Sequence, residues 1–246
     1  MKIISWNVNG LQSIMRKFNF KQFLINENPD IVCLQETKCN PFDMHFDNYS
    51  MFCSSSTSKN GYAGTAILSK IPATKLNVPH IDDDGRVTAI EIENNLIIIC
   101  IYSPNSQRKL EKLQMRIEWD SLFRTWIKSL EVNKKIIICG DFNVSYNELD
   151  IAEPKKHHRH PGFTDEERKS FELILTDFID VYRHKNPLSQ EYSFWSYLGK
   201  NYERNIGYRC DLFLIKKDMI NCNFTIDMLK NIRYSDHCPV VLVINT

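Results

Sequence analysis

Residues 135–143 read KIIICGDFN, and this stretch joins a candidate strand directly to a candidate site. The apolar run that ends at Gly140 is rich in isoleucine, which predicts a buried strand. Asp141 and Asn143 follow at once, and a carboxylate that abuts a buried strand is costly unless it has a partner. The stretch therefore predicts a sheet whose strand ends carry functional side chains.

Similar apolar runs recur along the chain, with helical spacing between them. A tight turn at Asn94 and Asn95 predicts an antiparallel hairpin, so the sheet is not purely parallel. An amphipathic stripe predicts a helix over residues 108–130, and Thr164 with Glu167 forms a capping box that begins another. A short helix is expected over residues 18–26. Strands are expected over residues 2–6, 31–35, 65–69, 87–93, 96–102, 135–140, 211–215 and 240–244. Interspersed strands and helices predict an α/β fold with helices outside the sheets.

Composition and charge limit the class of protein. Of the 246 residues, 43% are hydrophobic and 25% are charged, which is typical of a globular chain with a sizeable core. The formal net charge is +1, so a polyanion would have to be bound by a local patch or through a bound cation. Because no linker or clear repeat interrupts the sequence, a single domain over residues 1–246 is expected.

Cysteine usage and the N-terminus indicate a compartment. The eight cysteines show no CxxC spacing and several lie in apolar runs, so buried, reduced thiols are expected. The N-terminal MKIISWNVNG turns polar by its fifth residue, which argues against a signal peptide. The longest apolar stretch, residues 96–102, is too short to cross a bilayer. These features predict a cytoplasmic protein without a membrane partner.

Polar side chains stand at the ends of several other apolar runs. Each alone has an ordinary interpretation as a turn residue, a surface ion pair or a hydrogen-bonded histidine. The set consists of Glu36, Asp141, Asp211, Asp236, Asn7, Asn143 and His237. Together these residues supply hard oxygen ligands and one imidazole, which suits Mg²⁺ or Mn²⁺ and does not suit structural zinc. We expect them to converge at one sheet edge.

The polar segments, in this order, resemble the exonuclease III / apurinic-apyrimidinic endonuclease family of the endonuclease–exonuclease–phosphatase superfamily. The resemblance covers residues 2–243 and is carried by WNVNGL, LQETK, GYAGTAILSK, YSPNS, GDFNV, GFTDEER, FWSY and RCDLFLI. It implies a four-layer α/β sandwich, with two mixed β-sheets packed face to face and helices outside. It also implies a metal-dependent DNA-repair hydrolase. Such an enzyme cuts duplex DNA 5′ to abasic sites, trims blocked 3′ ends and has 3′→5′ exonuclease activity.

The same resemblance implies which residues hold the metal and activate water. Glu36 would bind the divalent cation, Mg²⁺ with Mn²⁺ as a substitute. Asn9 and Asp236 would lie beside the cation or reach it through water. Asp141 would deprotonate the attacking water, and Asn143 would hold that water in place.

Other residues would act on the scissile phosphate. His237 would hydrogen-bond a phosphate oxygen, and Asp211 would orient the imidazole of His237. Asn7 would support the surroundings of Asp211 and His237. Tyr102 and Asn105 would contact the phosphate.

Specificity would come from a small pocket for the extruded baseless sugar. Its walls would be Phe194, Tyr208 and Cys210. Many relatives carry Trp and Leu at the last two positions, so a roomier or more polar wall is expected here. Leu198 stands where some relatives insert a wedge into the duplex.

Residues 155–160, KKHHRH, are the sharpest cluster of basic side chains. A solvated loop that touches the DNA backbone is the favoured interpretation over a zinc site. His157 and His160 stand where relatives often place Asn, and both can donate hydrogen bonds. Further backbone contacts are expected from Tyr62 beside Gly61, from Arg108 and from Lys17.

Two other functions compete with a DNA-repair nuclease. A superfamily phosphatase would act on inositol phosphates or a lipid headgroup, but GFTDEER and FWSY argue against it. A non-catalytic DNA-binding module is disfavoured because the set of catalytic residues is complete. The nuclease would act as a monomer on double-stranded DNA, in a bacterial cytoplasm or, for a eukaryotic source, in the nucleus.

Overall fold

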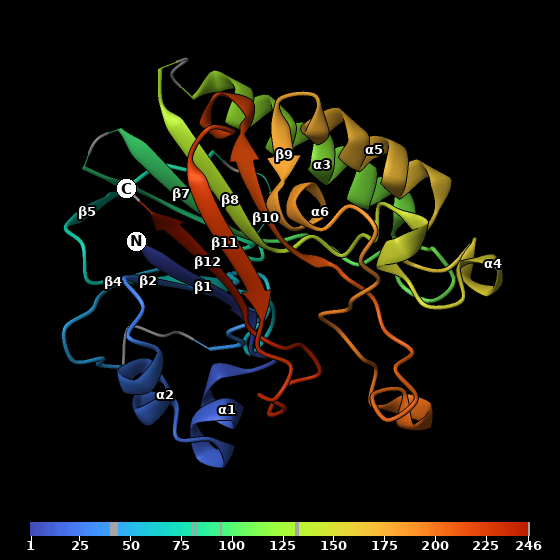
Figure 1. The fold of residues 1–246 in the computed structure, drawn as a ribbon, viewed down its shortest axis with the longest axis horizontal. Helices are drawn as coiled ribbons and strands as arrows, with labels where there is room; N and C mark the ends of the chain where they lie inside the picture. Colours follow the sequence, from blue (N-terminus) through green and yellow to red (C-terminus); the bar gives the residue numbers. More distant parts are fainter. Residues whose placement is uncertain (40–43, 80, 82, 94, 131–132, 246) are drawn as a thin grey trace.

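A computed structural model describes residues 1–39, 44–79, 81, 83–93, 95–130 and 133–245 (Figure 1). It contains two six-stranded sheets. The first has the strand order β11 (Asn223–Met228), β12 (Val240–Asn245), β1 (Lys2–Asn7), β2 (Ile31–Gln35), β4 (Thr65–Ser69) and β3 (Ser50–Ser54). The second has the order β5 (Ala73–Lys75), β6 (Val87–Ile92), β7 (Leu96–Tyr102), β8 (Lys135–Asp141), β10 (Asp211–Lys216) and β9 (Phe178–Asp180). Both sheets are mixed, because β1 and β2 pair in parallel, as do β7 and β8.

Helices cover the outer face of each sheet, as Figure 1 shows. The helices are α1 (Leu11–Lys17), α2 (Phe20–Glu27), α3 (Leu113–Ser129), α4 (Pro154–His157), α5 (Asp165–Leu175) and α6 (Val181–Lys185). Apolar side chains of α1 and α2 pack on the first sheet, around Trp6. Those of α3 and α5 pack on the second sheet, around Ile99. A third cluster fills the space between the two sheets.

The alternation of side chains along a strand explains these layers. In β7, Ile97 and Ile99 pack under the helices, whereas Ile98 and Cys100 point toward the other sheet. Because both faces of the strand are buried, its sequence is a continuous apolar run instead of an alternating one. The expected four-layer sandwich, with two mixed sheets inside and helices outside, is confirmed.

Each expected strand is present, but other elements differ from the expectation. The helix expected over residues 108–130 begins only at Leu113, because Gln107 and Leu110 have left-handed backbones. The expected antiparallel pairing of β6 and β7 is confirmed; Asn94 of their turn lies outside the described residues, and Asn95 has a φ of 59°. Helix α1 and strands β3, β5, β9 and β11 were not expected from the sequence.

The cysteines agree with the expectation of buried, reduced thiols. All the cysteines are free, and most are buried, as their apolar surroundings predicted. Within the described part of the chain, no helix is both long and apolar enough to cross a membrane.

Candidate active site

The ends of strands from both sheets meet at one end of the sandwich. Asn7 ends β1, Tyr102 and Asp141 end the parallel pair β7 and β8, and Asp211 begins the antiparallel β10 directly opposite Asp141. Glu36 follows β2. The expected convergence of these side chains is therefore present. They lie where the strand ends of two facing sheets meet, and not along the edge of a single sheet.

Asn7 links the two sheets at the centre of this site. Its Nδ2 donates to Glu36 Oε1 and to Asp141 Oδ2, each at 2.9 Å. The resemblance implied support for Asp211 and His237, but these side-chain bonds go to Glu36 and Asp141 instead. The fully buried Asn7 therefore sets the distance between two carboxylates that come from different sheets.

His237 is held by a buried carboxylate. Its Nδ1 donates to Asp211 Oδ2 at 2.8 Å, and the same oxygen accepts a 2.6 Å bond from Ser193 Oγ. Burial alone would lower the pKa of His237, but Asp211, by its charge and hydrogen bond, and Asp141 raise that pKa to about 10. The ring is therefore an imidazolium at neutral pH. Its Nε2 lies 3.9 Å from Asp141 Oδ2, beyond hydrogen-bond distance.

Asp141 has the protonation behaviour of a general base. Burial, assisted by the negative charges of Asp211 and Glu36, raises its pKa to about 7, although His237 and a backbone bond oppose the rise. That bond runs from Asn143 N to Asp141 Oδ1 at 2.8 Å. A carboxylate with a pKa near the working pH can accept a proton efficiently.

Asn143 is fixed by neighbours on the loop that follows β7. Its Nδ2 donates to Ser103 O at 2.8 Å, and its Oδ1 accepts from Asn105 Nδ2 at 2.9 Å. Its backbone has a left-handed φ of 47°. Asn105 thus contacts the site through Asn143.

Glu36, Asn9 and Asp236 form the other side of the site, together with Lys38. Lys38 Nζ lies 2.9 Å from Glu36 Oε2 and donates to Asn9 Oδ1, while Asn9 Nδ2 donates to Asp236 Oδ1 at 3.0 Å. Burial alone would raise the pKa of Glu36, but the Lys38 ammonium and the bonds from Lys38 and Asn7 outweigh it and lower that pKa. Glu36 is therefore a carboxylate that already binds a cationic group.

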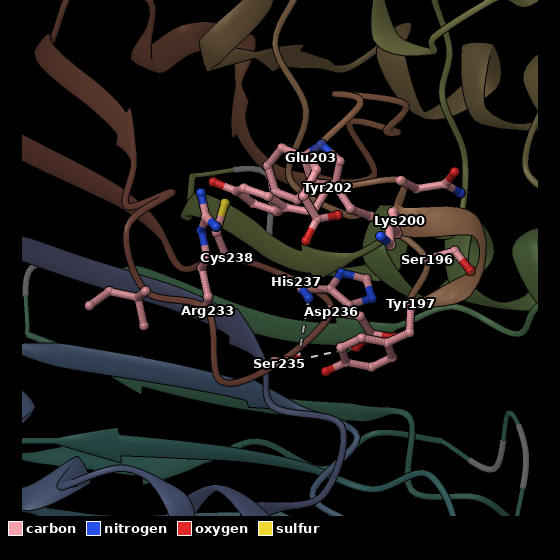
Figure 2. A pocket seen from close by; sticks show the side chains of 13 residues that line it. Ser196, Tyr197, Lys200, Tyr202, Glu203, Arg233, Ser235, Asp236, His237 and Cys238 are labelled. Atoms are coloured by element: carbon pink, nitrogen blue, oxygen red, sulfur yellow. Dashed lines mark hydrogen bonds between the residues drawn. The ribbon is translucent and has the colours of Figure 1, made fainter.

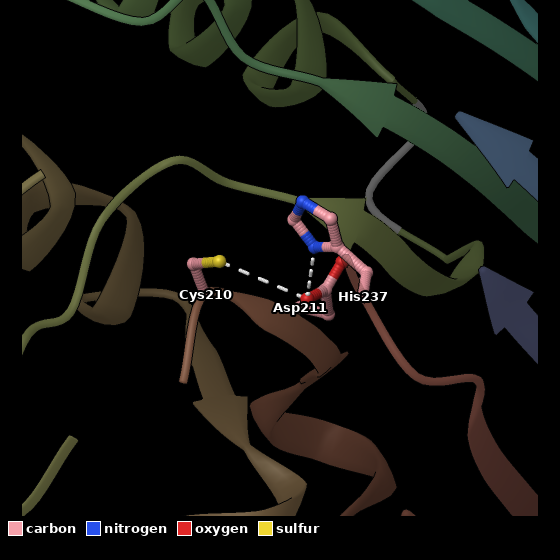
Figure 3. A group of neighbouring side chains, drawn as sticks. All are labelled: Cys210, Asp211 and His237. Carbon is pink, nitrogen blue, oxygen red and sulfur yellow. Dashed lines mark hydrogen bonds and ion pairs between the residues drawn. The ribbon is translucent and has the colours of Figure 1, made fainter. Parts of the chain in front are cut away.

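Two groups of side chains have the spacing of metal ligands among the described residues. In one, Glu36, Asp141 and His237 offer ligand atoms within 4.8 Å of one another. The other is Cys210, Asp211 and His237 (Figure 3). Burial raises the pKa of the Cys210 thiol well above its ordinary value, and a metal ligand must be a thiolate. The geometry of Figure 3 suits orientation of His237, and the oxygens around Glu36 fit a hard divalent cation.

Tyr102 presents a protonated phenol to the same cluster. Burial raises its pKa well above the ordinary value, and the charges of Glu36 and Asp141 add to the rise. The buried Arg86 lies over the Tyr102 ring at 4.7 Å and donates to Tyr62 Oη at 3.1 Å. Arg86 therefore joins the two tyrosines that the resemblance singled out.

The expected pocket walls lie next to His237. The ring of Phe194 is 4.7 Å from that of His237 and 5.9 Å from that of Tyr208. The His157 ring packs against Tyr208 at 5.7 Å and against His160 at 4.6 Å. The sequence predicted a loop over residues 155–160, but its first part lies in helix α4 (Pro154–His157). The line of rings connects this basic segment to His237.

Beyond the wall, a cavity of about 240 Å³ lies beside Asp236 and His237 (Figure 2). Tyr197, Lys200 and Arg233 are among its lining residues. Leu198, next to Tyr197, is 79% exposed, as a wedge residue would be. Cys210 is buried, and its Sγ lies 3.7 Å from Asp211 Oδ2.

The remaining expected DNA contacts lie outside the bonded cluster. Lys17, at the end of α1, and Arg108 are exposed. Burial lowers the pKa of His160, and the positive charges of His157 and Arg108 add to this effect. Arg108 and His160 therefore share one surface region.

Sequence reasoning missed the supporting roles of Lys38, Arg86 and Ser193. Lys38 belongs to the LQETK segment and Ser193 precedes FWSY, so both stand inside stretches that carried the resemblance. Arg86 follows a run of acidic residues, which gave no sign that its side chain would be buried.

The chain belongs to the Endonuclease/Exonuclease/phosphatase family, whose profile matches residues 4–237. It is 39% identical over 253 residues to the exodeoxyribonuclease of Bacillus subtilis, with full coverage of both chains. It is 37% identical to the DNA-(apurinic or apyrimidinic site) endonuclease of Dictyostelium discoideum, over all of this chain and 71% of that relative.

Solved structures agree with these relatives. The AP endonuclease of Leishmania major superposes with a TM-score of 0.90 at 27% identity, over all of this chain and 87% of that one. The AP endonuclease of Archaeoglobus fulgidus gives 0.86 at 26% identity over both whole chains. The expected exonuclease III and AP endonuclease branch is therefore confirmed, and the protein is a nuclease.

Proposed function

We propose that this nuclease hydrolyses the phosphodiester 5′ to abasic sites in duplex DNA, trims blocked 3′ ends and degrades strands in the 3′→5′ direction. The observation that carries the proposal is the pairing of Asp141 with the His237–Asp211 dyad. A base and a cationic hydrogen-bond donor face each other across 3.9 Å, and Glu36 lies within 4.8 Å of both. Relatives named exodeoxyribonuclease and AP endonuclease support this assignment.

The side chains meet the chemical needs of phosphodiester hydrolysis. Asp141 accepts the proton of the attacking water, which the Asn143 amide holds. His237 donates from Nε2 to a non-bridging phosphate oxygen, while Asp211 keeps the ring oriented. Tyr102, a protonated phenol, donates a hydrogen bond to the phosphate.

Glu36 would hold a divalent cation, with Asp236 and Asn9 next to it. Such a cation supplies positive charge to the phosphate oxygens. Mg²⁺ fits best, with Mn²⁺ as a substitute, because the donors are carboxylate and amide oxygens.

The rings beside His237 would select the substrate. Phe194, Tyr208 and Cys210 would enclose a flipped-out baseless sugar, and an intact nucleotide would be excluded by its size and by the free energy of unstacking. The exposed Leu198 would enter the duplex, and the loop of His157 and His160 would contact the backbone. Arg108, Tyr62 and Lys17 would add backbone contacts.

We further propose that the chain works as a single domain and as a monomer, in a bacterial cytoplasm. The side chains of the bonded cluster around Asn7, Asp141 and His237 all come from one chain.

The test is incision of an end-labelled abasic duplex, beside an undamaged duplex and an inositol polyphosphate. We expect incision of the abasic strand only when Mg²⁺ is present, with its loss on adding EDTA. His237→Ala should lower turnover by about 10²-fold or more and leave DNA affinity nearly intact. Faster release of phosphate from the inositol polyphosphate would favour a phosphatase, and metal-dependent turnover of neither substrate would favour a non-catalytic module.

A further inference from the structure

Lys38 places a positive charge at the oxygens that we assign to the divalent cation. Its Nζ lies 2.9 Å from Glu36 Oε2 and also donates to Asn9 Oδ1. The amide of Asn9 donates in turn to Asp236 Oδ1 at 3.0 Å. The ammonium therefore binds Glu36 directly and reaches Asp236 through Asn9, and these are side chains that suit a hard cation.

The backbone around Lys38 fixes this arrangement. Glu36 and Lys38 both have left-handed conformations, with φ of 49° and 52°, which residues with a side chain adopt rarely. Gly10 N donates to Glu36 O at 2.8 Å on one side of the turn, and Lys38 N donates to Ala63 O at 2.9 Å on the other. Such strain persists where the surrounding structure fixes it, and it is common at functional sites.

We propose that the Lys38 ammonium and the divalent cation compete for Glu36 and Asn9, so that Lys38 leaves these oxygens when the cation binds. The inference rests on the proposed function, which assigns the cation to Glu36. An ammonium is a compact charge on a flexible stem, so it can neutralise the carboxylate and still be displaced. A divalent cation bound to Glu36 would repel the Lys38 ammonium.

The competition gives Lys38 a defined task as a positioning residue. Asn7 holds Glu36 and Asp141 together, with 2.9 Å bonds to each. When no divalent cation is bound, the Lys38 ammonium offsets the repulsion between these two carboxylates. Lys38 thereby keeps the site assembled and sets how much free metal is needed to fill it.

The experiment measures Mn²⁺ binding directly, by the loss of the free-ion signal in electron paramagnetic resonance. We expect Lys38→Met to bind Mn²⁺ about three- to tenfold more tightly than the wild type, because the competing ion pair is gone. Lys38→Arg keeps the charge and should stay near the wild-type Kd. The rise in Tm on adding Mn²⁺ should also be larger in Lys38→Met than in the wild type.

Lys2→Met is the matched control. Lys2 forms a 2.7 Å ion pair with Glu27, and its side chain is about as exposed as that of Lys38. Lys2 lies at the other end of β1, so its replacement should leave Mn²⁺ binding unchanged.

Glu36→Gln separates the two ways of failing. If this variant loses Mn²⁺ binding while Lys38→Met binds no more tightly than the wild type, the metal assignment holds and the competition is overturned. If Glu36→Gln binds Mn²⁺ as the wild type does, the cation is not at Glu36, and both the metal assignment and the competition fail.

Discussion

At the scale of single residues, burial and neighbouring charges set the protonation states of Asp141 and His237. The charges of Asp211 and Asp141 raise the pKa of His237 to about 10 against the effect of burial. Burial raises the pKa of Asp141 to about 7. Both pKa values are raised, and they stay far enough apart for His237 to carry its proton at a pH where Asp141 can accept one. One residue can then donate a proton while the other accepts one at the same pH.

The pH dependence of incision follows from Asp141. A protonated Asp141 cannot accept a proton from water, so the rate should fall as the pH drops through about 7. A nearby divalent cation favours the carboxylate, so higher Mg²⁺ should move this fall to lower pH. The measurement is the pH–rate profile of abasic incision at two Mg²⁺ concentrations. In Asp141→Asn, whose residual rate has no such group, the fall should be absent; if it persists there, another residue titrates.

Tyr208 should decide how well abasic DNA is told from intact DNA. Its ring packs between His157, at 5.7 Å, and Phe194, at 5.9 Å, and we propose that it forms part of the wall for the flipped-out sugar. Tyr208→Ala should therefore lower the ratio of abasic incision to 3′→5′ degradation of undamaged duplex. His157→Ala should lower this ratio less, because the His157 ring acts by supporting Tyr208. An unchanged ratio in Tyr208→Ala would place the selectivity elsewhere.

The contacts of single residues were the hardest to predict from the sequence. The residue types at Asn7, Glu36 and His237 indicated a site, but not which side chains would bond. Asn7 joins Glu36 to Asp141 because β1 and β8 belong to different sheets whose ends meet. That partnership depends on how the sheets pack, which no local pattern contains.

At the scale of elements, sequence patterns predicted the structure correctly where hydrogen bonds between residues close in sequence determine it. The capping box at the start of α5 forms as predicted, with Thr164 Oγ1 accepting from Glu167 N. The predicted start of α3 was wrong because Leu110, inside the predicted helix, has a left-handed φ of 60°. Ser106, just before this segment, is held by a long-range bond from its Oγ to Glu167 Oε1 at 2.7 Å.

Loss of the Glu167 side chain should therefore lower the free energy of unfolding by more than loss of the helix cap alone. Its fully buried carboxylate accepts from Gly162 N at 2.8 Å and Thr164 Oγ1 at 2.7 Å, in addition to Ser106. Thr164→Ala should lower the free energy of unfolding by about 1 to 2 kcal/mol. Glu167→Ala leaves several buried donors without a partner and should cost about 3 kcal/mol or more. Urea unfolding followed by circular dichroism tests the order, and equal losses would mean that only the cap matters.

At the scale of the whole molecule, the packing of two sheets turns scattered sequence segments into one site. The strands could be predicted from apolar runs such as residues 96–102 and 135–140, and the family resemblance gave their arrangement. Short strands such as β5 and β9 gave no periodic signal, since each covers only three residues. The pairing of Asp141 with Asp211 across β8 and β10 follows from topology, which composition and spacing alone leave undetermined.

Because the net charge is only +1, DNA binding should depend on local clusters of basic side chains. Exposed ion pairs such as Lys156 with Glu153 and Arg159 with Glu166 contribute little, so these cations can exchange partners for phosphates. With Lys155, Arg108 and Lys17, they should give a log–log slope of DNA affinity against salt of about −3 to −5.

Neutralising two of these basic side chains tests the assignment. Lys155→Ala with Lys156→Ala should make the slope about 1 to 2 less steep and weaken binding to abasic and intact duplex alike, because phosphate contacts carry no sequence information. The matched control is Lys128→Ala with Lys217→Ala, which removes the same charge near the end of α3 and directly after β10. A Kd for DNA measured by fluorescence anisotropy over a series of salt concentrations gives each slope. The same change of slope in both pairs would mean that the overall charge attracts DNA, and that the loop before α5 does not contact the backbone.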